Sequence, residues 1–186
     1  MSPAFRVGEH NIGSLFSKAD AKKVSSYLRS TRSLAFGPLR QKFEGEFARY
    51  VGARYAASTD HCTVALEMAA QLLRIKAGDE VIASPQTFVA THIGLVRRGV
   101  RLRFGDVDPA NLCLDPNTIE RQITKKTRAI YVVHYAGCTA DMGPILEIAR
   151  RRGLAVVEDA AHAPGAVYRG KKVGSLGDIT CFSLNS

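Results

Sequence analysis

Two adjacent carboxylates and a histidine occur in the stretch LAVVEDAAHAPGA. Four apolar residues precede Glu158 and Asp159, which predicts a buried strand with both acids at its carboxyl end. Because successive side chains of a strand face opposite sides, the two acids should serve different partners. His162 follows three positions later, so Asp159 and His162 could hold a metal, although no third ligand is suitably spaced. An acid that caps the next segment is the structural alternative.

Two other stretches have residue types suited to ligand binding. In STDHCTVAL a helix should start near Thr63, and helix N-termini suit phosphate because their N–H groups are unpaired. The alternative is an ordinary helix cap by Thr63 or Asp60. In SPQTFVAT, Phe88 could stack on a planar ligand ring or belong to the core. The phosphate loops of common ATP and dinucleotide sites are absent from the sequence.

The periodicity of apolar residues indicates which elements position these side chains. It predicts helices over 18–30, 39–52, 63–75, 87–99, 115–124 and 141–153, and strands over 53–59, 80–85, 100–107, 128–136, 154–159 and 179–184. Alternating strands and helices predict an α/β fold, a three-layer α/β/α arrangement with a mostly parallel sheet. Ligands of such sheets gather at the carboxyl ends of the strands. We expect a helical segment over 1–50 and a ligand-binding part over 51–186.

Composition restricts the class of protein. Hydrophobic residues make up 46% of the 186 residues and charged residues 23%, as in a globular domain, and neither a secretory signal nor a membrane span is apparent. Four scattered cysteines, without a CxxC pair, favour reduced thiols in the cytoplasm over zinc or disulfides. The net charge of +9 is spread without a long basic run, which disfavours nucleic acid and leaves an anionic small-molecule ligand and an uninformative solvated surface as equal alternatives.

In chain order, the stretches FEGEFARYVG, CTVAL, AGDEVIASPQTFVAT, GDVDPANLCLDPNTIERQIT, TRAIYVVHYAGCTADM and VVEDAAHAPGAVYRGKKVGSLGDITCFSL form a recognisable set. This set closely resembles the DegT/DnrJ/StrS-type sugar aminotransferases. These are pyridoxal 5'-phosphate (PLP) enzymes with the type I, aspartate-aminotransferase fold. The resemblance runs from about Ile12 to Ser186, and the EDAAHAPGA block with the following FSL is its most specific part.

The resemblance implies cofactor-binding roles for matching positions. Asp159 matches the acid that bonds the pyridine nitrogen and keeps it protonated. His162 matches a position, often glutamine, near the cofactor's ring oxygen, and Phe88 matches the aromatic that stacks on the ring. Thr63 and the backbone of Cys62 match the phosphate cup at a helix start. Ser183 matches the serine of the family's FSF motif, which also contacts the phosphate.

The sequence departs from the family pattern in two places. Cys62, preceded by His61, stands where the family usually has glycine, which lets a backbone approach a phosphate closely. The family's lysine that bonds the cofactor is expected at position 188, two residues after Ser186. No catalytic residue is therefore expected within the chain. We expect an N-terminal fragment, inactive alone, that lacks the rest of the large domain and a small C-terminal domain.

The resemblance implies transfer of an amino group from glutamate or glutamine to a keto-sugar, commonly nucleotide-linked, by a homodimer. Two alternatives use the same fold: a sugar dehydratase with histidine in place of the lysine, and a regulatory or binding protein without catalysis. An unrelated nucleotide-binding α/β domain is a third alternative, which the missing phosphate loop disfavours.

Overall fold

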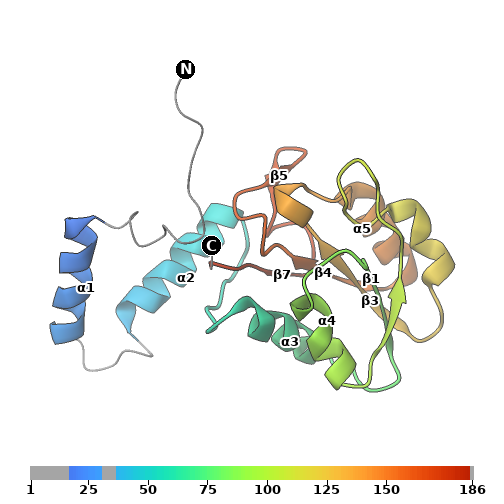
Figure 1. The fold of residues 1–186 in the computed structure, drawn as a ribbon, viewed down its shortest axis with the longest axis horizontal. Helices are drawn as coiled ribbons and strands as arrows, with labels where there is room; N and C mark the ends of the chain where they lie inside the picture. Colours follow the sequence, from blue (N-terminus) through green and yellow to red (C-terminus); the bar gives the residue numbers. More distant parts are fainter. Residues whose placement is uncertain (1–16, 31–36, 185–186) are drawn as a thin grey trace.

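The computed structural model describes residues 17–30 and 37–184 (Figure 1). Its centre is a sheet of five parallel strands in the order β2-β1-β3-β4-β7. The strands are β1 (Glu80–Ala83), β2 (Arg101–Phe104), β3 (Thr127–Val133), β4 (Ala155–Asp159) and β7 (Ile179–Cys181). The inner strands β1, β3 and β4 are almost wholly buried, as short apolar runs are when helices cover both faces of a parallel sheet.

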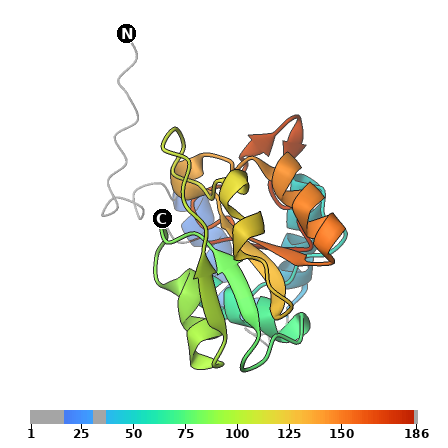
Figure 2. The ribbon, with the colours of Figure 1, turned by 90° about the vertical axis from the view of Figure 1, so that its right-hand side faces the viewer.

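Helices form one layer on each face of this sheet. α3 (Cys62–Leu72) and α4 (Ala90–Arg97) pack on one face around Leu66, Leu95 and Tyr131. α5 (Met142–Arg152) packs on the other face, together with two short 3-10 helices, η2 (Pro116–Thr118) and η3 (Glu120–Gln122). Figure 2 shows α4 and α5 on opposite sides of the strands. The predicted three-layer, mostly parallel α/β fold is therefore confirmed.

Two helices precede the layered part. α1 (Lys18–Ser30) buries none of its side chains, whereas α2 (Pro38–Val51) buries Ala48 and Val51 and ends at Gly52 in the left-handed conformation. Phe47 of α2 meets Phe182, just after β7, edge to face at 5.1 Å between ring centroids. Residues 1–16 of the expected helical segment lie outside the described residues.

A small hairpin, β5 (Val167–Tyr168) and β6 (Lys171–Lys172), connects β4 with β7. The Tyr168 hydroxyl donates to Asp141, at the start of α5, and accepts from the Gly143 N–H at 2.9 Å. The Lys172 ammonium lies 3.3 Å from the centre of the Tyr50 ring of α2. The hairpin thus contacts both α5 and α2.

Three predicted elements differ from the structure. The strand predicted over 53–59 is wrong: this segment pairs with none of the described strands and lies against α2, where the Ser58 N–H and hydroxyl donate to Glu44 at 2.8 and 2.7 Å. The helix predicted over 115–124 is two 3-10 turns, begun by Asp115 and Pro116 as expected. The strand predicted over 179–184 ends at Cys181.

Candidate functional site

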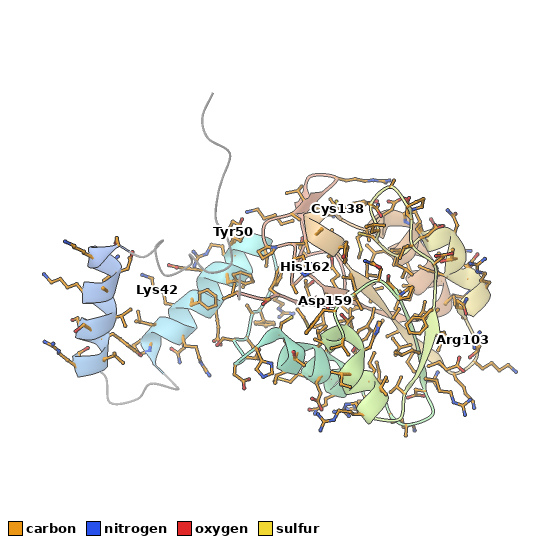
Figure 3. The ribbon with its side chains drawn as sticks, in the orientation of Figure 1. Lys42, Tyr50, Arg103, Cys138, Asp159 and His162 are labelled. Carbon is orange, nitrogen blue, oxygen red and sulfur yellow. The ribbon has the colours of Figure 1, made fainter. Side chains whose placement is uncertain are left out.

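The carboxyl edge of the sheet collects the polar side chains singled out in the sequence. The chain runs from β1 outward to β2 and then returns to β3 on the other side of β1, and crevices form at such a reversal. Asp159 ends β4, with Val133 of β3 and Cys181 of β7 beside it in register. In Figure 3 Asp159 and His162 lie near the middle of the molecule, well apart from Arg103 of β2.

Asp159 is buried and both of its carboxylate oxygens accept hydrogen bonds. The Thr91 hydroxyl donates to Oδ2 at 2.6 Å, and the Ala161 backbone N–H donates to Oδ1 at 3.1 Å. Only 5% of Asp159 is exposed, so these donors stabilise its charge where water does not. The carboxylate keeps further lone pairs with which to accept from a ligand.

Sequence reasoning missed Thr91, which lies in the first turn of α4. Its hydroxyl also lies 2.6 Å from that of Thr87, one helical turn earlier in the chain. The spacing of the two threonines could have suggested their mutual contact. Their link to Asp159, 68 residues away, depends on how α4 packs against β4 and has no local signal.

His162 and Phe88 are both exposed at this edge. The Ala136 N–H donates to His162 Nδ1 at 3.3 Å, so in the neutral imidazole the proton is on Nε2, which remains able to donate to a ligand. The His162 ring also meets Tyr135 edge to face at 5.8 Å. Phe88 is 70% exposed, so it is not part of the core that the described residues form.

The start of α3 has open backbone N–H groups. The N-cap of this helix is His61, whose side chain makes no capping bond, so neither Thr63 nor Asp60 is the cap. Within the described part of the chain, no acceptor bonds the N–H groups of Cys62 and Thr63. Such a helix start suits an anion.

A cavity of about 1040 Å³ lies between α2, α3 and the segment that follows β7. Cys62 and Ser183 both line it, so the structure brings together the helix start and the serine of the FSL motif. The residues that line this cavity do not include Thr63, Phe88, Asp159 or His162. Phe88 precedes α4, Asp159 ends β4 and His162 follows β4.

Two thiols lie near Asp159 on the α3 side of the sheet. Burial, with the Asp159 charge adding to it, raises the pKa of Cys62 to about 12. Burial raises the pKa of Cys181 to about 12 as well, with smaller contributions from Cys62 and Asp159. Both groups are therefore neutral thiols at pH 7, and Cys62 brings no negative charge to the helix start.

Glu158 lies on the opposite face of β4, as the alternation of the strand predicts. It is wholly buried and accepts three hydrogen bonds: from His134 Nε2 at 2.8 Å, from the Gly177 N–H at 2.8 Å and from the Thr180 hydroxyl at 2.7 Å. The Ala140 N–H donates to His134 Nδ1 at 3.2 Å, which places the imidazole proton on Nε2, facing Glu158. These bonds tie the ends of β3 and β4 to the chain around β7.

The residues at this edge fit PLP. The cofactor has a phosphate, for which the structure offers the start of α3 and Ser183, and a planar ring, for which it offers the exposed face of Phe88. For the ring nitrogen it offers the buried carboxylate of Asp159, and for the ring oxygen the Nε2–H of His162.

Among the residues that the structure describes, no three His, Cys, Asp or Glu side chains gather as metal ligands, and no helix has the length and apolar character to cross a bilayer.

The chain is similar to proteins of polysaccharide and amino-sugar metabolism. It is 41% identical over 170 residues to the spore coat polysaccharide biosynthesis protein SpsC of Bacillus subtilis, covering 91% of the chain and 43% of SpsC. It is 45% identical over 143 residues to the GDP-perosamine synthase of Caulobacter vibrioides, covering 77% of the chain and 38% of that protein. The chain spans less than half the length of these relatives.

Solved structures agree with this similarity. The crystal structure of an aminotransferase from Psychrobacter cryohalolentis superimposes with a TM-score of 0.86 at 40% identity, covering 90% of the chain and 42% of that protein. The structural neighbours are PLP-dependent aminotransferases of the type I fold. The model of the DegT/DnrJ/EryC1/StrS aminotransferase family matches residues 15–186, almost the whole chain. The chain belongs to this family of aminotransferases, as its motifs predict.

Proposed function

We propose that the chain forms the cofactor-binding part of a PLP-dependent aminotransferase that acts on a keto-sugar. The observation that carries the proposal is the geometry of Asp159, a buried carboxylate held by two donors at the carboxyl end of a central strand. When bound, PLP would supply an electron sink that stabilises negative charge on the substrate carbon.

Three residues would contact the cofactor ring. Asp159 would accept from the protonated ring nitrogen and stabilise its positive charge. His162 would donate from Nε2 to the ring oxygen. Phe88 would pack its exposed ring against the cofactor ring and exclude water from that side.

The phosphate would be held at the start of α3. The N–H groups of Cys62 and Thr63 would donate to it, and Ser183 would reach it from across the shared cavity. A lysine at position 188 would complete the site, and no residue of the chain is assigned the proton transfer at the substrate carbon.

The substrates are proposed from the relatives. A GDP-perosamine synthase is among them, which supports a nucleotide-linked keto-sugar as the amino acceptor, and glutamine:inosose aminotransferases support glutamine as the donor. The net charge of +9 suits a substrate with a diphosphate. Four free cysteines fit a reducing compartment, here the cytoplasm, and the family resemblance supports a homodimer.

The experiment that tests this function is an amino-transfer assay on the whole protein. Purified protein, PLP, glutamine and a nucleotide-linked keto-sugar are incubated, and the amino-sugar is detected by mass spectrometry. We expect product, and we expect Asp159→Asn to lower kcat by roughly 10²-fold or more, because the ring nitrogen loses its anionic partner. No product with any keto-sugar tried, or equal turnover of the variant, would contradict the proposal.

A further inference from the structure

Thr91 has one hydroxyl proton and three possible acceptors. Its Oγ1 lies 2.6 Å from Asp159 Oδ2, 2.6 Å from Thr87 Oγ1 and 3.2 Å from the Phe88 carbonyl oxygen. The carboxylate is the strongest acceptor and is among the nearest, so the proton of Thr91 goes to Asp159. The short contact with Thr87 is then a bond in which Thr87 donates and Thr91 accepts. The two hydroxyls form a directed chain from Thr87 through Thr91 to Asp159.

We propose that Thr87 and Thr91 are positioning residues, a two-hydroxyl relay that holds the Asp159 carboxylate in the orientation that keeps the ring nitrogen of the cofactor protonated. This inference rests on the proposed function and deepens it. Neither threonine is assigned a contact with the cofactor, and both act through Asp159.

The relay fixes a carboxylate that has few other restraints. Asp159 is buried, and among the described residues its second oxygen accepts from the Ala161 N–H alone, at 3.1 Å, a longer bond than the 2.6 Å bond from Thr91. Without the Thr91 hydroxyl, Oδ2 loses its donor at a residue that is only 5% exposed. The carboxylate is then free to turn toward another donor, away from the ring nitrogen.

The relay also joins two of the proposed cofactor contacts. Thr87 and Thr91 lie on either side of Phe88 in the chain, so the segment that presents the ring-stacking aromatic is bonded to the acid that faces the ring nitrogen. The aromatic and the acid are therefore held in one unit, although β1 and β4, which they follow, are not neighbours in the sheet.

Three other titratable groups interact electrostatically with Asp159. Cys62 of α3 and Cys181 of β7 have pKa values raised to about 12, chiefly by burial, so they stay neutral. Burial lowers the pKa of His92 of α4, so this imidazole is also mostly neutral at pH 7.

The test uses the whole protein, freed of cofactor, and pyridoxamine 5'-phosphate labelled with ¹⁵N in its ring, a ligand that is not bonded to a lysine. The ¹⁵N chemical shift reports whether the ring nitrogen is protonated, and a pH series gives its midpoint. We expect Thr91→Val, which keeps the shape but removes the hydroxyl, to lower this midpoint by about one unit and the affinity about tenfold. Thr91→Ser restores the hydroxyl and should behave as wild type, and Thr87→Val should give a smaller shift in the same direction.

Two further variants separate the possible outcomes. Asp159→Asn serves as the reference for loss of the anionic partner, and Thr118→Val, at a buried threonine that bonds Asp106 and Asp115, controls for the loss of any buried hydroxyl.

A midpoint in Thr91→Val equal to wild type, with a shift in Asp159→Asn, overturns the relay but leaves the proposed function standing. If wild type does not bind the ligand, or Asp159→Asn changes nothing, the proposed function fails and the relay with it. If Thr91→Val does not fold, Thr87→Val decides, and an unchanged midpoint overturns the relay.

Discussion

The neighbouring carboxylates of β4 have different roles because their surroundings differ. Glu158 accepts three hydrogen bonds from protein donors on the α5 side, whereas Asp159 accepts two and keeps lone pairs for a ligand. A carboxylate whose partners are all internal stabilises the fold, and one that is only partly satisfied can bind a charged group. The alternation of a strand predicts that the two acids have different partners, but only the packing shows which acid has open lone pairs.

The four free cysteines should differ sharply in reactivity. With a pKa of about 12, Cys62 and Cys181 have roughly one thiolate in 10⁵ molecules at pH 7, whereas Cys138 is exposed. We expect iodoacetamide at pH 7.5 to modify Cys138 much faster than Cys62 or Cys181, as measured by mass spectrometry of peptides over time. Modification of Cys62 at the rate of Cys138 would contradict its neutral, half-buried state.

Among the candidate residues, those with a local signal were the easiest to predict. Asp159 follows an apolar run and Phe88 follows a strand, so sequence periodicity alone brings both to one edge of the sheet. Thr91 could not be found in this way, because its partner is 68 residues away and a threonine early in a helix is ordinary. The cofactor-binding roles of all six candidate residues depend on the family resemblance and remain proposals: Cys62, Thr63, Phe88, Asp159, His162 and Ser183.

At the scale of elements, the Glu158 side chain adds hydrogen bonds to the backbone pairing of β4 with β7. It accepts from Gly177 and Thr180, which lie just before and within β7, and from His134 at the end of β3. Gly177 has little room for a side chain, because a Cβ there would lie 2.9 Å from the Val156 carbonyl oxygen and 3.2 Å from Glu158 Oε1. The course of the chain toward Ser183 therefore depends on this buried network.

Replacing Glu158 by glutamine should destabilise the fold. The amide cannot accept all three donors, and its own N–H groups would face donors that are already buried. We expect Glu158→Gln to lower the free energy of unfolding by about 3 kcal/mol, measured by urea denaturation. Glu46→Gln, which removes an exposed pair with Lys42 at 3.9 Å, is the control and should cost less than about 0.5 kcal/mol. Equal losses of unfolding free energy in the two variants would contradict the stabilising role of the hydrogen bonds to Glu158.

Element prediction succeeded where a helix or strand is decided by its own residues and failed where it needs a distant partner. The apolar runs of β3 and β4 and the amphipathic α5 were predicted within a few residues. The segment over 53–59 has residues suited to a strand, yet strands form only beside a partner, and none of the described strands pairs with it.

At the scale of the whole molecule, stability should depend on pH through His92. Burial lowers the pKa of this imidazole, although the Ser84 carbonyl and the Asp159 charge oppose the shift. Its buried Nε2 has no partner within the described residues, so a proton there would be an unpaired donor. The folded state thus binds fewer protons than the unfolded state near the ordinary histidine pKa of about 6.5.

The direction of the pH dependence of stability follows from this difference in proton binding. The stability contribution of neutral His92 is present above pH 6.5 and declines as the pH falls through that value. We expect the free energy of unfolding to decrease between pH 7.5 and 5.5, with part of this loss removed in His92→Gln. His61→Gln, at an exposed histidine, is the control and should leave the pH dependence of the unfolding free energy unchanged. If His92→Gln left the dependence of the unfolding free energy on pH unchanged, His92 would not be its source.

The proposed site depends on the whole fold. A parallel sheet brings the carboxyl ends of its strands to one edge, even where the strands are far apart in sequence. The most direct test of the central proposal, that this edge binds PLP, is isothermal titration calorimetry of the whole protein, freed of cofactor, with pyridoxamine 5'-phosphate and with pyridoxamine. We expect saturable 1:1 binding of the phosphate form, at least about tenfold weaker binding without the phosphate, and a similar loss in Asp159→Asn but not in Asp108→Asn. No binding of pyridoxamine 5'-phosphate, or equal affinity of wild type and Asp159→Asn, would contradict the proposal.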